Sequence, residues 1–396
     1  MKIGIYGGTF NPIHMGHMEA ARFASEELGL DRLYLIPAGI PPHKEIAGGS
    51  PAPEQRLAMT ELAAEAVGPA AKASDMELRR KGKSYTLDTV KEIRERHPHA
   101  RLYLLMGTDM FLTFHQWRDP EKLAKLCTLC AFRRSEKDGA ELFAAQREKL
   151  ETDFDADIVT MDLPRIVEIS STQLRAALAD GQGMEYLDPA VYGYILREGL
   201  YGVKRDLRRL SLDELRFVAL SMLKRTRVPH VLGTEETAAR LALRWGEDEE
   251  TARRAALLHD CTKKLNGEQH RALLRQYDIS LDAEEEREEK LYHAVTGAAV
   301  ARHVFGVPPE MESAIRWHTT GKADMTTLEK IIYLADYIEP TRDFCDLTEL
   351  RALAFEDLDG AMLLGLTMAV RDLKKRGAAV HSNSARAMDY LKGKQP

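Results

Sequence analysis

The first 200 residues alternate short apolar runs with longer segments whose apolar side chains recur every three or four positions. The short runs predict buried strands and the longer segments predict helices. We expect strands at residues 2–6, 33–37, 75–79, 102–106, 126–132 and 157–161. We expect helices at residues 16–29, 54–67, 86–96, 119–125, 139–151, 170–179 and 189–198. The alternation predicts an α/β fold with a parallel, Rossmann-like sheet, helices on both faces and ligands at the carboxyl ends of the strands.

The rest of the chain carries only helical patterns. These lie at residues 211–223, 229–245, 248–260, 266–277, 284–305, 308–318, 327–339 and 348–376. A short basic segment broken by glycine, GLYGVKRDLRRL, separates the two halves. We therefore predict one domain at 1–202, a linker at 203–208 and an all-α domain at 209–396. The acidic run at 282–289 is interpreted as a solvated helix face.

Composition restricts the class of protein. A chain of 396 residues with 44% hydrophobic and 30% charged residues is typical of a globular protein with two or three domains. The net charge of −6 argues against a general nucleic-acid binder. The N-terminus lacks the apolar region of a secretory signal, and no apolar run approaches the ~18–20 residues of a membrane span. We expect a cytoplasmic protein that binds neither nucleic acid nor membranes, and leave a homo-oligomer open.

The cysteines do not predict a metal site. Cys127 and Cys130 form a C-x-x-C pair, but the pair lies in a predicted strand, where residues three apart point to opposite faces. The chain has no second C-x-x-C that would complete a zinc site. We interpret both as buried thiols, and Cys261 and Cys345 as unpaired.

The stretch GGTFNPIHMGH, from Gly7 to His17, carries the strongest chemical signal of the first half. It joins a predicted strand to a predicted helix, where main-chain N–H groups and the helix dipole favour an anion. Two glycines allow a sharp turn and a close approach of phosphate. His14 and His17 are three residues apart at the helix start, so both imidazoles can face one phosphate chain.

Three further strings accompany this turn. PPHK ends at Lys44 in a loop, and a lysine there can close on a phosphate chain. SYTLDT begins a helix with hydroxyls at its cap. ISSTQLR offers three hydroxyls at a helix start, a capping box from Ser170 to Gln173, and Arg175 one turn later. The dinucleotide fingerprint G-x-G-x-x-G is absent from the first loop, which argues against a dehydrogenase.

Together these strings resemble the nucleotidyltransferase superfamily, and within it the bacterial nicotinate-nucleotide adenylyltransferases, over about residues 1–200. The nicotinate branch is indicated by PPHK, SYTLDT, Gly107-Thr108-Asp109 and the segment ending at Trp117; Thr108 stands where the family usually has another residue. The resemblance implies that ATP is bound by residues of these strings. They are Gly8, Thr9, Phe10, His14, His17, Lys44, Ser170, Ser171, Thr172 and Arg175. It also implies that Thr86, Asp109 and Trp117 surround nicotinate mononucleotide.

The reaction implied is attack of the mononucleotide phosphate on the α-phosphorus of ATP, supplied with Mg²⁺, and release of pyrophosphate. Such catalysis needs positioning and charge stabilisation rather than a covalent intermediate. His14, His17, Lys44 and Arg175 are the expected catalytic residues. Another acceptor, such as nicotinamide mononucleotide or phosphopantetheine, is the alternative.

The helical half has polar residues where apolar helices end. His259 and Asp260 follow the run AALL, and Asp336 follows IIYLA. A buried carboxylate is costly unless it binds a cation. Together with His230, these residues offer the imidazole and carboxylate ligands that suit iron, manganese or zinc.

The strings ALLHDCTKKL, IRWHTTGKADMTTLEKIIYLADYIEPTR and GLTMAVRDL resemble HD-domain phosphohydrolases, and among them the symmetrical diadenosine-tetraphosphate hydrolases, over about residues 208–390. The resemblance implies metal ligands at His230, His259, Asp260 and Asp336. It places His293 and His318 at a second metal or at substrate phosphates, and Thr319, Thr320, Lys322 and Arg342 at phosphate.

The implied reaction is metal-assisted hydrolysis of diadenosine tetraphosphate to two ADP, with iron or manganese as the metal. Two alternatives remain. The helical half is a hydrolase of other nucleotides, or it is a non-catalytic sensor of adenine dinucleotides that regulates the transferase.

Overall fold

The chain forms two compact units, Met1–Lys204 and Arg205–Pro396. The computed structural model describes residues 1–40, 48–133, 140–204, 206–343 and 346–393. The predicted loop lysine, Lys44, and the predicted unpaired thiol of Cys345 lie outside the described residues. None of the described helices is both long and apolar enough to cross a membrane.

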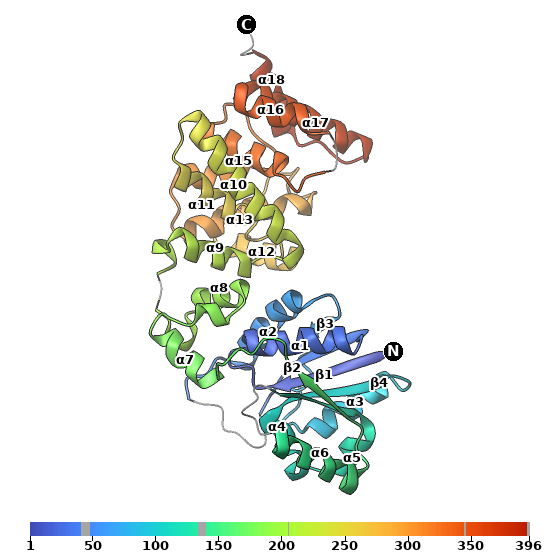
Figure 1. The fold of residues 1–396 in the computed structure, drawn as a ribbon. Coiled ribbons are helices and arrows are strands. Elements are labelled where there is room, and N and C mark those ends of the chain that lie inside the picture. The colour runs from blue at the N-terminus through green and yellow to red at the C-terminus, as the bar shows by residue number, and fades with distance from the viewer. Residues whose placement is uncertain (41–47, 134–139, 205, 344–345, 394–396) are drawn as a thin grey trace. The chain divides into compact units, whose positions relative to one another are not determined.

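The first unit is built on a parallel sheet with the strand order β3-β2-β1-β4-β5-β6 (Figure 1). The strands are β1 (Lys2–Gly8), β2 (Arg32–Pro37), β3 (Ala71–Ala73), β4 (Arg101–Gly107), β5 (Thr128–Arg133) and β6 (Ile158–Asp162). In register, Ile5 lies between Tyr34 of β2 and Leu104 of β4. The strand order reverses beside β1, and in such sheets ligands bind outside the carboxyl ends of the strands at that point.

Helices cover both faces of this sheet (Figure 1). They are α1 (Met15–Glu27), α2 (Pro53–Val67), α3 (Thr86–Arg96), α4 (Thr108–Leu112), α5 (Pro120–Leu126), α6 (Ala140–Phe154), α7 (Ser171–Ala179) and α8 (Pro189–Glu198). Because both faces are covered, apolar residues at successive positions of the central strands, such as Leu104 and Leu105, are all buried. The predicted α/β fold is confirmed.

One predicted strand is wrong. Residues 75–79 form a turn in which the carbonyl of Asp75 accepts the N–H groups of Leu78 and Arg79. The third strand is instead the short segment Ala71–Ala73. Met76 packs into the core although it lies in a turn, and its apolar side chain was therefore mistaken for that of a strand residue. The short helix α4 was not predicted.

The second unit is all-helical in its described part, as predicted. Its helices are α9 (Leu212–Ser221), α10 (Val228–Trp245), α11 (Glu249–Leu258), α12 (Gly267–Gln276), α13 (Tyr292–His303), α14 (Pro309–Trp317), α15 (Thr327–Ile338), α16 (Thr348–Glu356), α17 (Leu358–Lys375) and α18 (Ser382–Gly393). The predicted helix 348–376 is two helices, because Asp357 is non-helical and its side chain caps α17 at Gly360.

The acidic run at 282–289 is not a solvated helix face, and that prediction is wrong. These residues form turns before α13, which begins at Tyr292 rather than at 284. Glu285 is buried and forms an ion pair with Arg316 of α14. Glu284 accepts hydrogen bonds from the N–H and hydroxyl of Ser382, at the start of α18. Glu284 and Glu285 therefore connect elements of the unit that are distant in sequence.

Candidate functional site

The turn after β1 presents two imidazoles at the start of α1. His14 is the residue before the helix and has an extended backbone. Its N–H donates to Nδ1 of His17 over 3.3 Å, and the two ring centroids are 3.8 Å apart. A neutral His17 then carries its proton on Nε2, a donor suited to a phosphate oxygen. A side chain on Gly16 would place Cβ 3.1 Å from the His14 ring, so glycine allows this packing.

The same turn is braced by residues that are remote in sequence. Arg56 is fully buried, and its Nη1 donates to the carbonyl of Thr9 over 2.8 Å. Phe10 is held at a positive φ of 45°. Asn11 donates from its side-chain amide to Ser50 Oγ over 2.8 Å. These contacts hold the main chain of Thr9, Phe10 and Asn11 in position beside Gly8.

Arg175 connects the turn to the start of α7. Its Nη1 donates to the Asn11 carbonyl over 2.8 Å, and its Nη2 donates to Thr172 Oγ1 over 3.1 Å. The predicted capping box is confirmed, since Ser170 Oγ accepts the N–H of Gln173 and Gln173 Oε1 accepts the N–H of Ser170. The structure thus brings the first turn of α7, including Ser171, into connection with the His14–His17 turn.

A small pocket of about 30 Å³ adjoins His14. Its lining includes Tyr6 of β1, Gly107 at the end of β4, Phe132 of β5 and Val167 from the segment before α7. The pocket lies at the carboxyl ends of neighbouring parallel strands, where the sheet order predicts a ligand.

The residues expected around nicotinate mononucleotide lie on three elements. Thr86 begins α3, Asp109 lies in the first turn of α4 directly after β4, and Trp117 follows α4 with its ring 5.2 Å from that of Phe114. The guanidinium of Arg118 lies 4.4 Å from the Tyr85 ring centre, so the segments carrying Thr86 and Trp117 are in contact.

Six side chains converge inside the helical unit. They are His230 of α10, His259 and Asp260 after α11, His293 of α13, His318 after α14, and Asp336 of α15. His259 and Asp260 are fully buried. Nε2 of His230 lies 2.9 Å from Asp336 Oδ1, and Nε2 of His293 lies 3.3 Å from Asp260 Oδ1 and 3.1 Å from Nε2 of His318. The structure therefore brings together all six residues that the sequence proposed.

The four rings share one hydrogen-bonding pattern, in which Nδ1 faces an oxygen atom. Nδ1 of His259, His293 and His318 lies 2.6, 2.6 and 2.7 Å from the carbonyl oxygens of Ala256, Lys290 and Ile315, respectively. Nδ1 of His230 lies 3.0 Å from Glu339 Oε1. Because these oxygens only accept, each Nδ1 carries a hydrogen, and a neutral ring directs the lone pair of Nε2 toward the centre.

This donor set fits a divalent cation. Three central atoms, Nε2 of His230, Nε2 of His259 and Oδ1 of Asp260, have no hydrogen-bond partner among the described residues. An unprotonated imidazole nitrogen facing a carboxylate oxygen is favourable only when a proton or a cation lies between them. Imidazole and carboxylate together suit iron, manganese or zinc.

The ionisation of these groups follows from burial and charge. Burial, assisted by the charge of His259, lowers the pKa of His318 to about 4, and burial lowers the pKa of His293 well below its usual range. Burial would also lower the pKa of His259, but the carboxylates of Asp260 and Asp336 outweigh it and raise that pKa. The lowered pKa values keep the rings of His293 and His318 neutral, which is the form of imidazole that binds a metal.

Cationic side chains surround the cluster, and two of them were not predicted. Arg227 forms an ion pair with Asp260, and Lys263 Nζ lies 2.9 Å from Nε2 of His293. Arg342, which was predicted, donates to Asp336 Oδ1 over 2.7 Å. Arg227 and Lys263 lie three residues before His230 and three after Asp260, and this sequence proximity was the available signal.

The HTTG segment follows the C-terminal end of α14. Thr319 comes directly after His318, and Thr320 donates from Oγ1 to the Gly321 carbonyl over 3.0 Å. Lys322 Nζ lies 3.0 Å from Glu329 Oε2. Thr320 and Lys322 therefore have partners within the protein in this structure.

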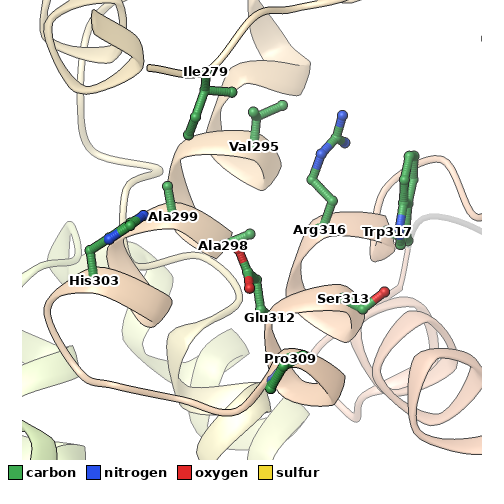
Figure 2. Close-up of a pocket in the computed structure, with 10 residues that line it drawn as sticks. All are labelled: Ile279, Val295, Ala298, Ala299, His303, Pro309, Glu312, Ser313, Arg316 and Trp317. Carbon is green, nitrogen blue, oxygen red and sulfur yellow. The ribbon is translucent and has the colours of Figure 1, made fainter. Parts of the chain in front are cut away.

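A separate pocket of about 360 Å³ lies on another side of α13 and α14, and Figure 2 shows its lining. Its residues include Val295, His303, Glu312, Arg316 and Trp317, and none of the six residues of the cluster is among them. The guanidinium of Arg316 stacks on Trp317 at 4.3 Å and pairs with Glu285. The pocket is thus distinct from the His/Asp cluster.

Besides Arg227 and Lys263, sequence reasoning missed Arg56, Asn11 and Glu339. It also missed Tyr201, whose hydroxyl donates to the side-chain oxygen of Asn11. Arg56 had a visible signal, because it lies on the same helical stripe as the buried residues Met59 and Ala63. For the other three, partners lie far away along the chain, and no local pattern identified them.

Comparison with known proteins gives two separate matches. The Cytidylyltransferase-like family model matches residues 5–177, and the HD domain model matches residues 227–341. A protein of Pelobacter propionicus described as a probable nicotinate-nucleotide adenylyltransferase is 36% identical over 214 residues, which are 51% of this chain and 98% of that protein. A protein of Neisseria meningitidis serogroup B with the same description is 38% identical over 205 residues, 50% of this chain and 98% of that protein.

One of the matching solved structures covers about half of this chain. It is the crystal structure of a predicted HD superfamily hydrolase involved in NAD metabolism from Clostridium acetobutylicum. The sequences are 38% identical, the match covers 47% of this chain and 99% of that one, and the TM-score is 0.45.

Proposed function

We propose that residues 1–202 transfer AMP from ATP to nicotinate mononucleotide, giving nicotinate adenine dinucleotide and pyrophosphate. The reason is that the chain belongs to the nicotinate-nucleotide adenylyltransferase family. The observation that carries this proposal is the identity of 36% over 98% of a relative's length. The residues that the Cytidylyltransferase-like family model matches, 5–177, include the turn at His14 and His17 and the start of α7, which Arg175 connects.

The geometry supports an in-line transfer. The start of α1, with its N–H groups and dipole, attracts the phosphate chain of ATP. His17 Nε2–H donates to the α-phosphate as charge accumulates there, and His14 lies beside it. Ser170, Ser171, Thr172 and Arg175 bind phosphate from the α7 side, and Lys44 is a further proposed phosphate ligand. Mg²⁺ accompanies ATP and neutralises part of its charge.

Acceptor selection belongs to the opposite side of the site. Thr86, Asp109 and Trp117 would surround nicotinate mononucleotide. In this arrangement the acceptor phosphate approaches the α-phosphorus from the side opposite pyrophosphate, and catalysis is positioning plus charge stabilisation.

For the second unit, an HD domain, we propose metal-assisted hydrolysis of diadenosine tetraphosphate to two ADP. His230, His259, Asp260 and Asp336 would hold the metal, iron or manganese, and the convergence of unpartnered atoms at this point supports that assignment. When bound, the cation supplies Lewis acidity toward water and phosphate. His293, His318 and Arg342 would contact the phosphates or a second metal. Thr319 would contact phosphate as well, and so would Thr320 and Lys322 once released from their present partners.

One incubation tests both proposals. The whole protein is given ATP, nicotinate mononucleotide and diadenosine tetraphosphate, and every product is identified by mass spectrometry. Nicotinate adenine dinucleotide, pyrophosphate and ADP are expected. Faster turnover with nicotinamide mononucleotide or phosphopantetheine would overturn the first acceptor assignment.

Substrate panels and metal analysis address the second unit. If deoxynucleotides or guanosine alarmones are hydrolysed and diadenosine tetraphosphate is not, the proposed substrate is wrong. If the purified protein binds no metal and hydrolyses none of these nucleotides, the unit is a sensor rather than a hydrolase.

A further inference from the structure

We propose that Glu339 is the positioning residue of the metal centre, acting through His230. The proposal rests on the proposed function of the second unit, since it requires that His230 binds a metal. Glu339 is fully buried at the end of α15, three residues after Asp336. Its Oε1 lies 3.0 Å from Nδ1 of His230.

His230 differs from the other three rings in its acceptor. His259, His293 and His318 each face the carbonyl of the residue three positions earlier, so the local main chain orients them. His230 instead depends on a carboxylate 109 residues away. A carboxylate holds the Nδ1 proton more strongly than a carbonyl does, which fixes the tautomer and makes Nε2 a better electron donor.

The carboxylate is itself held in place. Thr341 donates to it twice, from its N–H to Oε2 over 2.7 Å and from Oγ1 to Oε1 over 2.6 Å. Arg342 Nε lies 3.9 Å from Oε1, while its Nη2 binds Asp336. Glu339 Oε1 therefore accepts the Nδ1 proton of His230 from a fixed direction. Arg342 lies near this carboxylate and also binds that of Asp336.

Gly233 makes the space that this contact needs. A Cβ at position 233 would lie 2.5 Å from Glu339 Oε2 and 3.3 Å from its Cδ. Gly233 is one helical turn after His230 on α10. Glycine there lets the Glu339 carboxylate lie against the backbone of α10, so a single added methyl group displaces Glu339 without altering His230.

The structure thus offers two independent ways to disturb the same contact. Glu339→Gln removes the charge at almost constant volume, and Gly233→Ala displaces the carboxylate while keeping its charge. Glu329→Gln is the matched control, because Glu329 is another buried glutamate of α15 that pairs with Lys322 rather than with a histidine.

The experiment titrates metal-free full-length protein with Mn²⁺ in competition with a fluorescent chelator. Relative to the wild type, Kd should rise about 10–100-fold in Glu339→Gln, the usual effect of losing such an outer partner. Gly233→Ala should change Kd in the same direction, and Glu329→Gln should stay within about twofold. A purely structural role would lower Tm without changing Kd for Mn²⁺.

The outcomes separate the two proposals. If the wild type binds no Mn²⁺, the proposed metal centre is wrong. If the wild type binds Mn²⁺ and Glu339→Gln binds it within twofold, the role of Glu339 is wrong and the metal centre stands. If Glu339→Gln does not fold, the Kd of Gly233→Ala decides, and an unchanged value there overturns the inference.

Discussion

The hydroxyl of Tyr201 donates a hydrogen bond of 2.9 Å to the side-chain oxygen of Asn11, 190 residues earlier in the chain. Both side chains are buried, and the main-chain carbonyl of Asn11 accepts from Arg175. The last residues of the first unit therefore hold the turn that carries His14 and His17.

Removing this hydroxyl tests its importance. In Tyr201→Phe the buried Asn11 oxygen loses its donor, which should lower the free energy of unfolding of the first unit by about 1–3 kcal/mol. Adenylyl transfer should weaken as the turn loosens, while nucleotide hydrolysis by the second unit stays unchanged. Denaturation and steady-state kinetics measure both, and Tyr186→Phe, at a half-buried tyrosine of the same unit, is the control. A variant with wild-type stability and transfer would show that the contact contributes nothing.

His17 is predicted to act on charge rather than on folding. His17→Ala should retain the fold, because the ring lies at a helix start, and should lose on the order of 10²–10³ in transfer rate. Circular dichroism and pyrophosphate release provide the two readouts. His99→Ala, at an exposed histidine of the same unit, is the control. Near wild-type turnover in His17→Ala would exclude the proposed donor.

Asp260 is predicted to separate the two activities. Asp260→Ala should abolish bound metal and hydrolysis together, since a fully buried carboxylate at the centre of the cluster is removed. Adenylyl transfer should survive. Metal content by mass spectrometry and product analysis check this. Asp372→Ala is the control, because Asp372 is a half-buried aspartate of the same unit that pairs with Arg376. Hydrolysis that persists in Asp260→Ala would mean that the catalytic site lies elsewhere.

The buried carboxyl of Glu77 is predicted to make the stability of the first unit depend on pH. Burial raises the pKa of this carboxyl, although a hydrogen bond from Thr89 and the charge of Arg80 oppose the shift. A raised folded-state pKa means that stability is fully present below the unfolded-state pKa and is lost as pH rises through the folded-state pKa. Glu77→Gln removes this loss, so the variant should gain stability relative to the wild type from pH 4 toward neutrality.

Urea denaturation of the first unit at about pH 4, 5.5 and 7 measures this difference. Glu95→Gln, at an exposed position of α3, should show no such trend. A constant difference between Glu77→Gln and the wild type across this range would contradict the prediction.

The two thiols of the C-x-x-C pair are predicted to be unreactive. Burial raises the pKa of Cys130 to about 12 and raises that of Cys127 as well. Only the thiolate reacts, so labelling by a thiol reagent at pH 8 should be slower than for a free cysteine by on the order of 10³ or more. In a Cys345→Ser background the native protein should stay unlabelled, and guanidinium should expose the thiols. Rapid native labelling would refute their burial.

Local patterns were sufficient for most of the fold. The apolar runs of β1, β2 and β4 and the stripes of the main helices were visible, because strand and helix periods are properties of neighbouring residues. The capping box at Ser170 and Gln173 was equally local. Predictions were wrong where one short pattern allowed two conformations, as at residues 75–79, at the acidic run and at Asp357.

The sequence alone determined that the chain has an α/β half and a helical half, and it identified the histidines and aspartates of both candidate sites. Only the tertiary structure decided what holds them. Arg56 on Thr9, Tyr201 on Asn11 and Glu339 on His230 are contacts between residues 47, 190 and 109 positions apart. No local periodicity encodes such pairs, because a buried polar group finds its partner only after the helices and strands that carry both have packed together.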